Sequence, residues 1–144
     1  MSGENERLIV RWFEEVWNQG RREVIHEMLA AGCTIHDGAT SITGPEEFKL
    51  FYGRMRSAFS GMRVTPQHGF SADACTCLRW SVTARHTGDG LGMAATGRAV
   101  EATRTTMVRI VNGRLTEAWQ NWDMLGMMQQ ITGAETARVY MAAG

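Results

Sequence analysis

The chain has 144 residues, and its 15 Lys and Arg residues balance 15 Asp and Glu residues. This length is normal for one domain with one core, and the zero net charge argues against a nucleic-acid backbone or an anionic membrane as main partner. No apolar run approaches the ~20 residues of a membrane span, and the first residues lack a secretory-signal profile. The three cysteines, with only a C-x-C pair among them, indicate reduced thiols. We therefore expect a cytoplasmic protein with a single domain over 1–144, a core at about 7–133 and a tail at 134–144.

The first sixty residues have helical periodicity. Helices are predicted at 4–18, 22–30 and 45–60, with a short strand at 33–37 and a loop at 38–44. The first helix has apolar residues at every third or fourth position, namely Leu8, Ile9, Trp12, Phe13, Val16 and Trp17. Pro45 stands at the start of the third helix with Glu46 and Glu47 behind it, where the helix dipole favours acids.

The rest of the chain alternates as β-strands do. Strands are predicted at 63–70, 74–86 and 98–111, and a last strand follows the Asn112-Gly113 hairpin turn. A glycine-rich loop at 87–97 could form a lid, and a final helix at 124–131 stops before Gly133. Helices grouped before antiparallel strands indicate an α+β fold, in which a curved antiparallel or mixed sheet wraps around the N-terminal helices as a cone with a pocket inside.

Strand alternation assigns two polar side chains to the inward face of the strand at 98–111. Arg104 and Thr106 share this face with apolar neighbours, namely Val100, Ala102, Val108 and Ile110. An inward arginine needs a partner or a ligand. On the strand before it, Trp80 and His86 share a face with Leu78, Val82 and Ala84. We therefore expect these polar groups to meet inside the cone.

Six short motifs occur in an order that resembles the SnoaL-like polyketide cyclases of the nuclear transport factor 2-like superfamily. They are Trp17-Asn18-Gln19-Gly20, His36-Asp37, Gly44-Pro45-Glu46-Glu47-Phe48, Arg85-His86-Thr87-Gly88, Arg109-Ile110-Val111-Asn112-Gly113-Arg114 and Trp119-Gln120-Asn121-Trp122-Asp123. The resemblance covers about residues 7–133. It implies an α+β cone, a homodimer or homotetramer, and an enzyme that closes an aromatic polyketide ring by intramolecular aldol condensation without cofactor or metal.

The resemblance also points to site residues, and here the chain departs from the family pattern. The characterised cyclases use an acid on the last strand and a histidine on the strand before it, and these positions correspond to Gln120 and Thr106. Glutamine cannot accept a proton. The family's pocket positions correspond to Trp17, Phe51 and Ile35, which suit a flat aromatic or terpenoid ligand. Further expected pocket walls are Met55, Trp80 and Trp122.

Each candidate catalytic residue also has a structural interpretation. His86 is the best surviving general base, or else a core or loop-anchoring histidine. Arg104 could stabilise an enolate, phenolate or carboxylate, or else form a buried salt bridge with Asp37 or Glu117. Asp123 could be the acid, although capping the last helix is the favoured role.

The remaining polar candidates are similarly open. Gln120 and Thr106 could orient a substrate carbonyl or a water, although internal hydrogen bonding is slightly favoured. Asp37 is an alternative base, although a turn role is favoured. The histidines have no H-x-H or H-x-x-x-H spacing, so we expect no metal.

The first functional hypothesis is a cofactor-independent enzyme of secondary metabolism that cyclises, isomerises or hydrates a hydrophobic polyketide-like or polycyclic molecule, as a lyase or isomerase. The second is a non-catalytic small-molecule-binding protein of the same fold, which the missing acid at position 120 favours. The third is an epoxide hydrolase-like enzyme. Such an enzyme requires Arg-x-Asp on the pocket strand, and the Arg104-Thr105-Thr106 sequence of this chain counts against it. The expected assembly is a homodimer formed through the outer sheet face, where Thr103, Thr105 and Met107 are uncharged.

Overall fold

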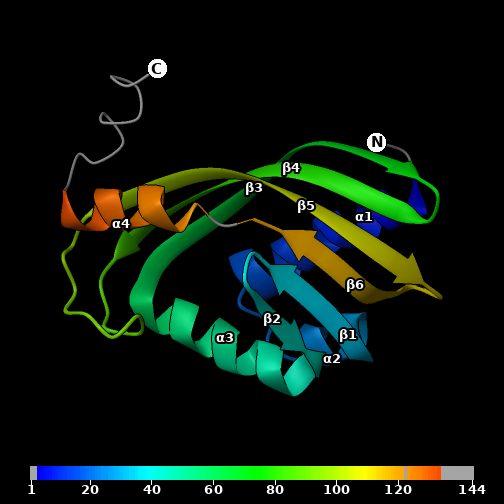
Figure 1. Cartoon of the computed structure of the whole chain (residues 1–144), viewed down its shortest axis with the longest axis horizontal. Coiled ribbons are helices and arrows are strands. Elements are labelled where there is room, and N and C mark those ends of the chain that lie inside the picture. Colours follow the sequence, from blue (N-terminus) through cyan, green and yellow to red (C-terminus); the bar gives the residue numbers. More distant parts are fainter. Residues whose placement is uncertain (1–2, 122, 134–144) are drawn as a thin grey trace.

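The computed structural model describes residues 3–121 and 123–133, which form helices packed against one curved sheet (Figure 1). The helical elements are α1 (Glu4–Trp12), the π-helix η1 (Phe13–Asn18), α2 (Val24–Met28), α3 (Gly44–Ala58) and α4 (Met124–Thr132). The strands are β1 (Leu29–Asp37), β2 (Thr40–Thr43), β3 (Phe59–Ala72), β4 (Cys75–His86), β5 (Ala99–Val111) and β6 (Arg114–Gln120). The predicted α+β class is therefore confirmed. None of the described helices combines the length and the apolar composition needed to cross a bilayer.

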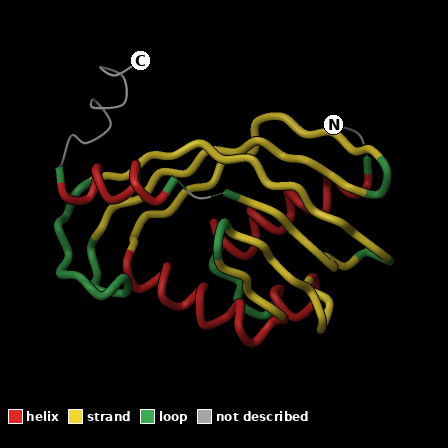
Figure 2. The backbone as a smooth tube through the Cα atoms, in the orientation of Figure 1, coloured by secondary structure: helices red, strands yellow, loops and turns green. Residues whose placement is uncertain are grey.

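The six strands form one mixed sheet in the order β2-β1-β6-β5-β4-β3. Strands β1 and β6 run parallel, and every other neighbouring pair is antiparallel. The long strands β3, β4 and β5 arch over the helices, and the sheet stays open at its edges (Figure 2). The concave face therefore looks toward α1, η1 and α3, and the hydrophobic core lies between these helices and the sheet.

The structure corrects the predicted boundaries around β1. The helix predicted at 22–30 ends at Met28, and β1 begins at Leu29 rather than at Cys33 because Leu29 pairs with Leu115 of β6. The loop predicted at 38–44 contains β2, whose Thr40 pairs with Asp37 across a turn at Gly38. Leu and Ala are strong helix formers, so local propensity extended the helix where sheet pairing decides the structure.

The entry to α3 depends on a glycine. Gly44 has a φ of +80°, and a Cβ at this position would lie 2.9 Å from the carbonyl oxygen of Ala31 in β1. A side chain would therefore be strained and would push α3 away from the sheet. Pro45 follows in the first turn, and Glu46 and Glu47 occupy the dipole-favoured positions as predicted. This junction fixes the start of α3 close against β1.

The predicted inward face of the long strands is confirmed. Trp80, His86, Arg104 and Thr106 are all at most 6% exposed, and Gln120 is half-buried on the same side of the sheet. The outward neighbours Glu101, Thr103, Thr105 and Arg109 are exposed on β5. Polar side chains are thus carried into the interior on β4, β5 and β6 together.

The loop at 87–98 is docked on the end of α3. The backbone N–H groups of Thr87 and Gly88 both donate to the carbonyl oxygen of Ala58, at 3.1 Å each. A Cβ at Gly88 or Gly90 would collide with a carbonyl oxygen of α3. The glycines therefore permit close packing of this loop, which forms a wall at the end of the molecule next to α4 (Figure 1).

Candidate active site

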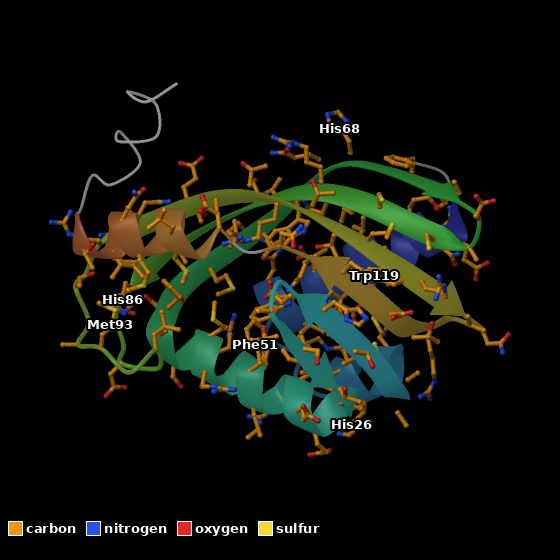
Figure 3. The ribbon with its side chains drawn as sticks, viewed as in Figure 1. His26, Phe51, His68, His86, Met93 and Trp119 are labelled. Atoms are coloured by element: carbon orange, nitrogen blue, oxygen red, sulfur yellow. The ribbon has the colours of Figure 1, made fainter. Side chains whose placement is uncertain are left out.

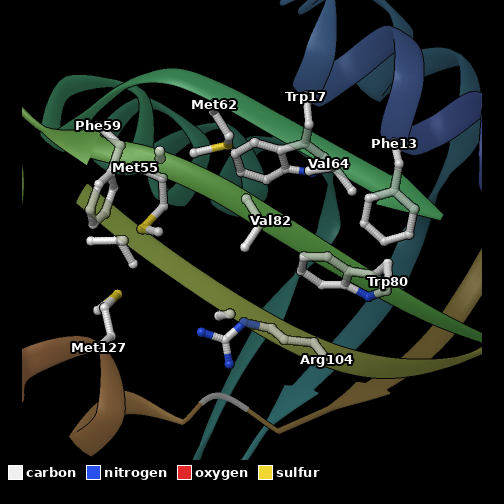
Figure 4. A pocket seen from close by; sticks show the side chains of 13 residues that line it. Phe13, Trp17, Met55, Phe59, Met62, Val64, Trp80, Val82, Arg104 and Met127 are labelled. Atoms are coloured by element: carbon white, nitrogen blue, oxygen red, sulfur yellow. The ribbon is translucent and has the colours of Figure 1, made fainter. Parts of the chain in front are cut away.

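An apolar cavity lies under the arch of the sheet. We call it the inner cavity; its volume is about 60 Å³, and its walls come from η1, α3, β3, β4, β5 and α4 (Figure 4). Twelve of its thirteen lining residues are apolar, and the exception is Arg104. In the aromatic wall Phe13 packs against Trp80, with ring centroids 4.8 Å apart and the rings tilted by 39°. One guanidinium group therefore faces an otherwise apolar space.

A second cavity adjoins the inner cavity on the side toward β6 and β1. This lateral cavity also has a volume of about 60 Å³ and shares Phe13, Trp17 and Trp80 with the inner one. Its polar lining consists of Thr106 and Gln120, and its apolar lining includes the predicted pocket residues Ile35 and Phe51. The positions that the family resemblance assigned to catalysis and binding therefore do line a cavity.

A larger chamber opens beside these two cavities. This outer chamber has a volume of about 510 Å³, within the range of small-molecule sites, and its exposed lining residues Thr40, Arg54 and Gly92 place it at the surface. It shares Met55 and Met127 with the inner cavity. Figure 4 shows the guanidinium end of Arg104 pointing toward the end of the inner cavity where both methionines lie. Unbranched methionine side chains adapt easily, so this pair can connect the chamber to the guanidinium.

The sheet register places several polar side chains on one row of the concave face. Asp37 of β1 pairs with Gln120 of β6, which pairs with Thr106 of β5. Arg104 lies two residues before Thr106 on β5, so its side chain points to the same face as that of Thr106. Because β5 runs antiparallel to β6 and β1, Arg104 lies beyond Thr106 toward the C-terminal ends of β6 and β1. Asp37, which lines the outer chamber, and Arg104 therefore meet at the same corner of the cone.

Burial dominates the electrostatics of Arg104. Its side chain is 4% exposed, and removal from water lowers the pKa of the guanidinium, which Asp37 and, to a smaller extent, Asp123 counteract. Its Nη1 also donates to the carbonyl oxygen of Asn121 at 3.5 Å. A charged donor is thus held in a poorly solvated place, where its interaction with a developing oxyanion is strong.

One predicted partner of Arg104 is wrong. Glu117 lies on the outer face of the sheet, where its carboxylate bonds to Nε2 of His36 at 2.8 Å and accepts from Arg109 at 2.9 Å. His36 also stacks on Trp119, with ring centroids 5.6 Å apart. Successive residues of a strand point to opposite faces, so His36 points outward while Asp37 points inward. Of the two predicted acids, Asp37 is therefore the one that acts on Arg104.

Thr106 is tied into the aromatic wall. The indole N–H of Trp80 donates to Oγ1 of Thr106 at 2.9 Å, and both side chains are buried. This bond satisfies the Trp80 donor and orients the threonine, whose own hydroxyl hydrogen can still be donated into the lateral cavity. Gln120 lies opposite Thr106 in the register, so the two can hold one oxygen atom of a ligand between them.

His86 lies behind the cavity wall rather than in it. It lines none of the three cavities described above, and in the view of Figure 3 it lies well apart from Phe51. Its ring instead lies 5.7 Å from that of Phe59, which does line the inner cavity. Its Nδ1 accepts the backbone N–H of Thr96 at 3.2 Å and lies 3.0 Å from the Thr96 hydroxyl. Its Nε2 is buried and meets no hydrogen-bond partner among the described residues. This arrangement favours the loop-anchoring interpretation of His86 over the role of general base.

Asp123 caps α4. Its Oδ1 accepts the backbone N–H of Gly126 at 2.9 Å, and the residue is exposed. The predicted capping role is confirmed. The Asp123 carboxylate also raises the pKa of Arg104, but less than Asp37 does. Trp122, a predicted pocket wall, lies outside the described residues.

Several residues of the cavity walls were not predicted from the sequence. Phe13, Phe59 and Met62 line the inner cavity, as does Met127 of α4. The periodicity of the first helix already placed Phe13 one turn from Trp17, so that signal was present. Met127 carried no signal of its own, because its place in the wall depends on how α4 folds back along β5.

Comparison with known proteins agrees with this geometry. The family model of the SnoaL-like polyketide cyclases matches residues 7–131. The chain belongs to the SnoaL-like polyketide cyclase family. Its relatives include the aklanonic acid methyl ester cyclases DauD of Streptomyces sp. (strain C5) and DnrD of Streptomyces peucetius. Each is 28% identical over 130 residues, which make up 85% of this chain and 79% and 88% of the relatives, respectively.

Solved structures confirm the nuclear transport factor 2-like fold for this SnoaL-like chain. A SnoaL-like protein from Jannaschia sp. CCS1 superposes with a TM-score of 0.82 at 21% identity, covering 91% of this chain and 93% of its own. A candidate polyketide cyclase from Acidithiobacillus ferrooxidans has a TM-score of 0.81 at 26% identity, covering 94% and 99%. The present chain shares this fold, and it carries Gln120 and Thr106 where the resemblance led us to expect an acid and a histidine.

Proposed function

We propose that the protein is a cyclase that closes a ring in a hydrophobic, polyketide-like molecule by an intramolecular aldol reaction. One observation carries the proposal: the Arg104 guanidinium is buried in the wall of an apolar, aromatic cavity. An aldol reaction passes through an enolate, whose oxygen gains negative charge in the transition state. A fixed cation in a poorly solvated site stabilises that charge more than it stabilises the neutral ketone.

The remaining site residues suit the same reaction. The aromatic walls at Trp17, Phe51 and Trp80 can lie against flat rings, and Thr106 and Gln120 can hold a second carbonyl oxygen. A ligand of several fused rings exceeds the inner and lateral cavities, at about 60 Å³ each, but fits the outer chamber of about 510 Å³. The reacting end would therefore pass Met55 and Met127 to reach Arg104, while the body of the ligand stays in the chamber.

The test is incubation of the purified protein with aklanonic acid methyl ester, the compound in the names of both curated relatives. The expected product has unchanged mass and one additional ring, detected by chromatography with mass spectrometry. Ala102→Phe places a ring in the inner cavity and should abolish turnover. Ala99→Phe makes the same change at an exposed position of the same strand and should keep it. Equal activity of the two variants would contradict the proposed site.

A second candidate function is a binding protein without chemistry, which the glutamine at position 120 favours. Tryptophan fluorescence distinguishes the two, because Trp17 and Trp80 line the cavities. Quenching by the same ester without any change in the ester over hours would support the binding protein and contradict the cyclase.

The proposed assembly is a homodimer formed through the outer sheet face. The register aligns an uncharged row across four strands, namely Phe70, Cys77, Met107 and Trp119, which ends at His36 on β1. Phe70 is 65% exposed although it is a large apolar side chain. A contiguous row of this kind on an open sheet is typical of a surface covered by a partner.

A further inference from the structure

We propose that Asp37 is the general base of the cyclase reaction, at a position one strand away from the one the family resemblance gave. The inference rests on the proposed function, because it names the group that removes the proton. Asp37 pairs directly with Gln120 in the register of β1 and β6, so an acid at 37 and an acid at 120 would stand side by side on the concave face. The carboxylate is thus displaced by one strand spacing rather than lost.

Asp37 has the access that a base needs. It is half-buried and lines the outer chamber, the cavity with room for a polycyclic ligand. Asp123 is exposed and occupied with capping α4, and His86 lines none of the three cavities. Among the described residues that line the three cavities, Asp37 is the one carboxylate.

The charges around Asp37 suit a carboxylate that works as a base. Arg104 of β5 faces it across the corner, Arg54 of α3 lines the same chamber, and Asp123 at the start of α4 is the neighbouring acid. His36 and Glu117 lie on the opposite face of the sheet. Two cations and one acid therefore surround the corner at which the Asp37 carboxylate would accept a proton.

The proposed step conserves charge within the site. An Asp37 oxygen forms an O–H bond with a hydrogen from the carbon next to a ligand carbonyl, and the electrons of the broken C–H bond move to the carbonyl oxygen as an enolate. The Arg104 guanidinium, relieved of the Asp37 charge, then stabilises the enolate oxygen. The enolate carbon attacks a second carbonyl carbon of the same molecule and forms the new C–C bond. The resulting alkoxide takes the proton back from Asp37, which restores the carboxylate, so no water or co-reactant is needed.

The experiment follows two readouts of Asp37→Asn with aklanonic acid methyl ester. One is ring closure, and the other is uptake of deuterium from D₂O at the acidic carbon, measured by mass spectrometry. Asp73→Asn is the matched control, because it makes the same change at an exposed turn between β3 and β4. We expect Asp37→Asn to lose about 10²–10⁴-fold in both rates, the usual scale for a lost acid–base group, while ligand quenching of fluorescence is retained. The control should behave like the wild type.

A double variant makes the inference specific. The double variant Asp37→Asn/Gln120→Asp moves the carboxylate from β1 to the neighbouring strand β6. Its deuterium exchange rate should be at least ten-fold higher than that of Asp37→Asn alone. If the wild-type protein takes up deuterium and the folded Asp37→Asn variant takes it up at the same rate, Asp37 is not the base. That result would leave the proposed cyclase function intact. A wild-type protein that binds the ester but neither exchanges nor cyclises it would overturn the proposed function, and the inference with it.

Discussion

Replacing Arg104 with methionine should separate stability from catalysis. Burial lowers the pKa of this guanidinium more than Asp37 and Asp123 raise it. A base whose pKa is lower in the folded than in the unfolded state destabilises the fold at every pH where it is charged, including neutral pH. A methionine of similar length removes this cost and suits the apolar lining. Exchanging both members of a buried ion pair for apolar side chains ranges from neutral to a gain of about 1–4 kcal/mol, whereas an unpaired charge left buried costs about 3–5 kcal/mol. Asp37 is half-buried and lines the outer chamber, so water can solvate its carboxylate in the variant and this second cost does not arise.

The expected result is therefore a melting temperature that is unchanged or raised by several degrees, since about 1 kcal/mol corresponds to roughly 2–4 °C in a chain of this size. Activity should change in the opposite direction. Loss of one oxyanion donor costs about 10²–10³-fold in kcat, or about 2.7–4 kcal/mol. Calorimetry and the ester assay measure the two quantities. Arg79→Met, at an exposed site on β4, is the control and should change neither. A strongly lowered melting temperature with normal turnover of the folded protein would refute the reasoning.

Four further variants, at three positions, test the structural roles assigned above. Asp123→Ala should cost about 1 kcal/mol of stability by removing the cap, whereas Asp123→Asn should be nearly neutral in both calorimetry and turnover; loss of turnover in Asp123→Asn would make this acid catalytic. His86→Ala should lower the melting temperature because Thr96 loses its anchor, while the folded protein keeps its turnover; a 10²–10⁴-fold loss at a normal melting temperature would return the base role to His86. Met107→Glu places a charge in the uncharged row of the outer face and should convert a dimer into monomers by light scattering; a wild-type protein with the mass of one chain would contradict the interface.

The sequence determined which side chains face inward but not how deep they lie. Alternation on β5 correctly placed Arg104 and Thr106 inside, because a period of two leaves only one choice of face. The same rule placed His86 inward, yet His86 lies at the end of β4, opposite Phe59 and against the loop. Depth along a strand depends on where the helices and α4 cover the sheet, and this information is not local to the strand.

The first strand shows a different limit. The resemblance rested partly on the adjacent pair His36-Asp37, and the parity of β1 separates these two side chains onto opposite faces of the sheet. Parity could not be assigned beforehand because β1 was predicted from Cys33 and its pairing with β6 was unknown. The strand β2 was missed for a related reason: four residues are too few to show an alternating pattern, and their pairing with β1 defines them.

The register also explains how this scaffold can tolerate a glutamine at position 120. Residues that pair across parallel strands project to the same face, so a carboxylate on β1 or on β6 presents its oxygens to nearly the same volume of the cavity. The oxyanion donor is carried by β5, on the far side of β6, and it can serve either carboxylate. An acid at both 37 and 120 would place two like charges in one corner, where each raises the pKa of the other. With Asp37 present, a neutral Gln120 avoids that repulsion and leaves an amide to orient the ligand, so the pair works best when one member is uncharged.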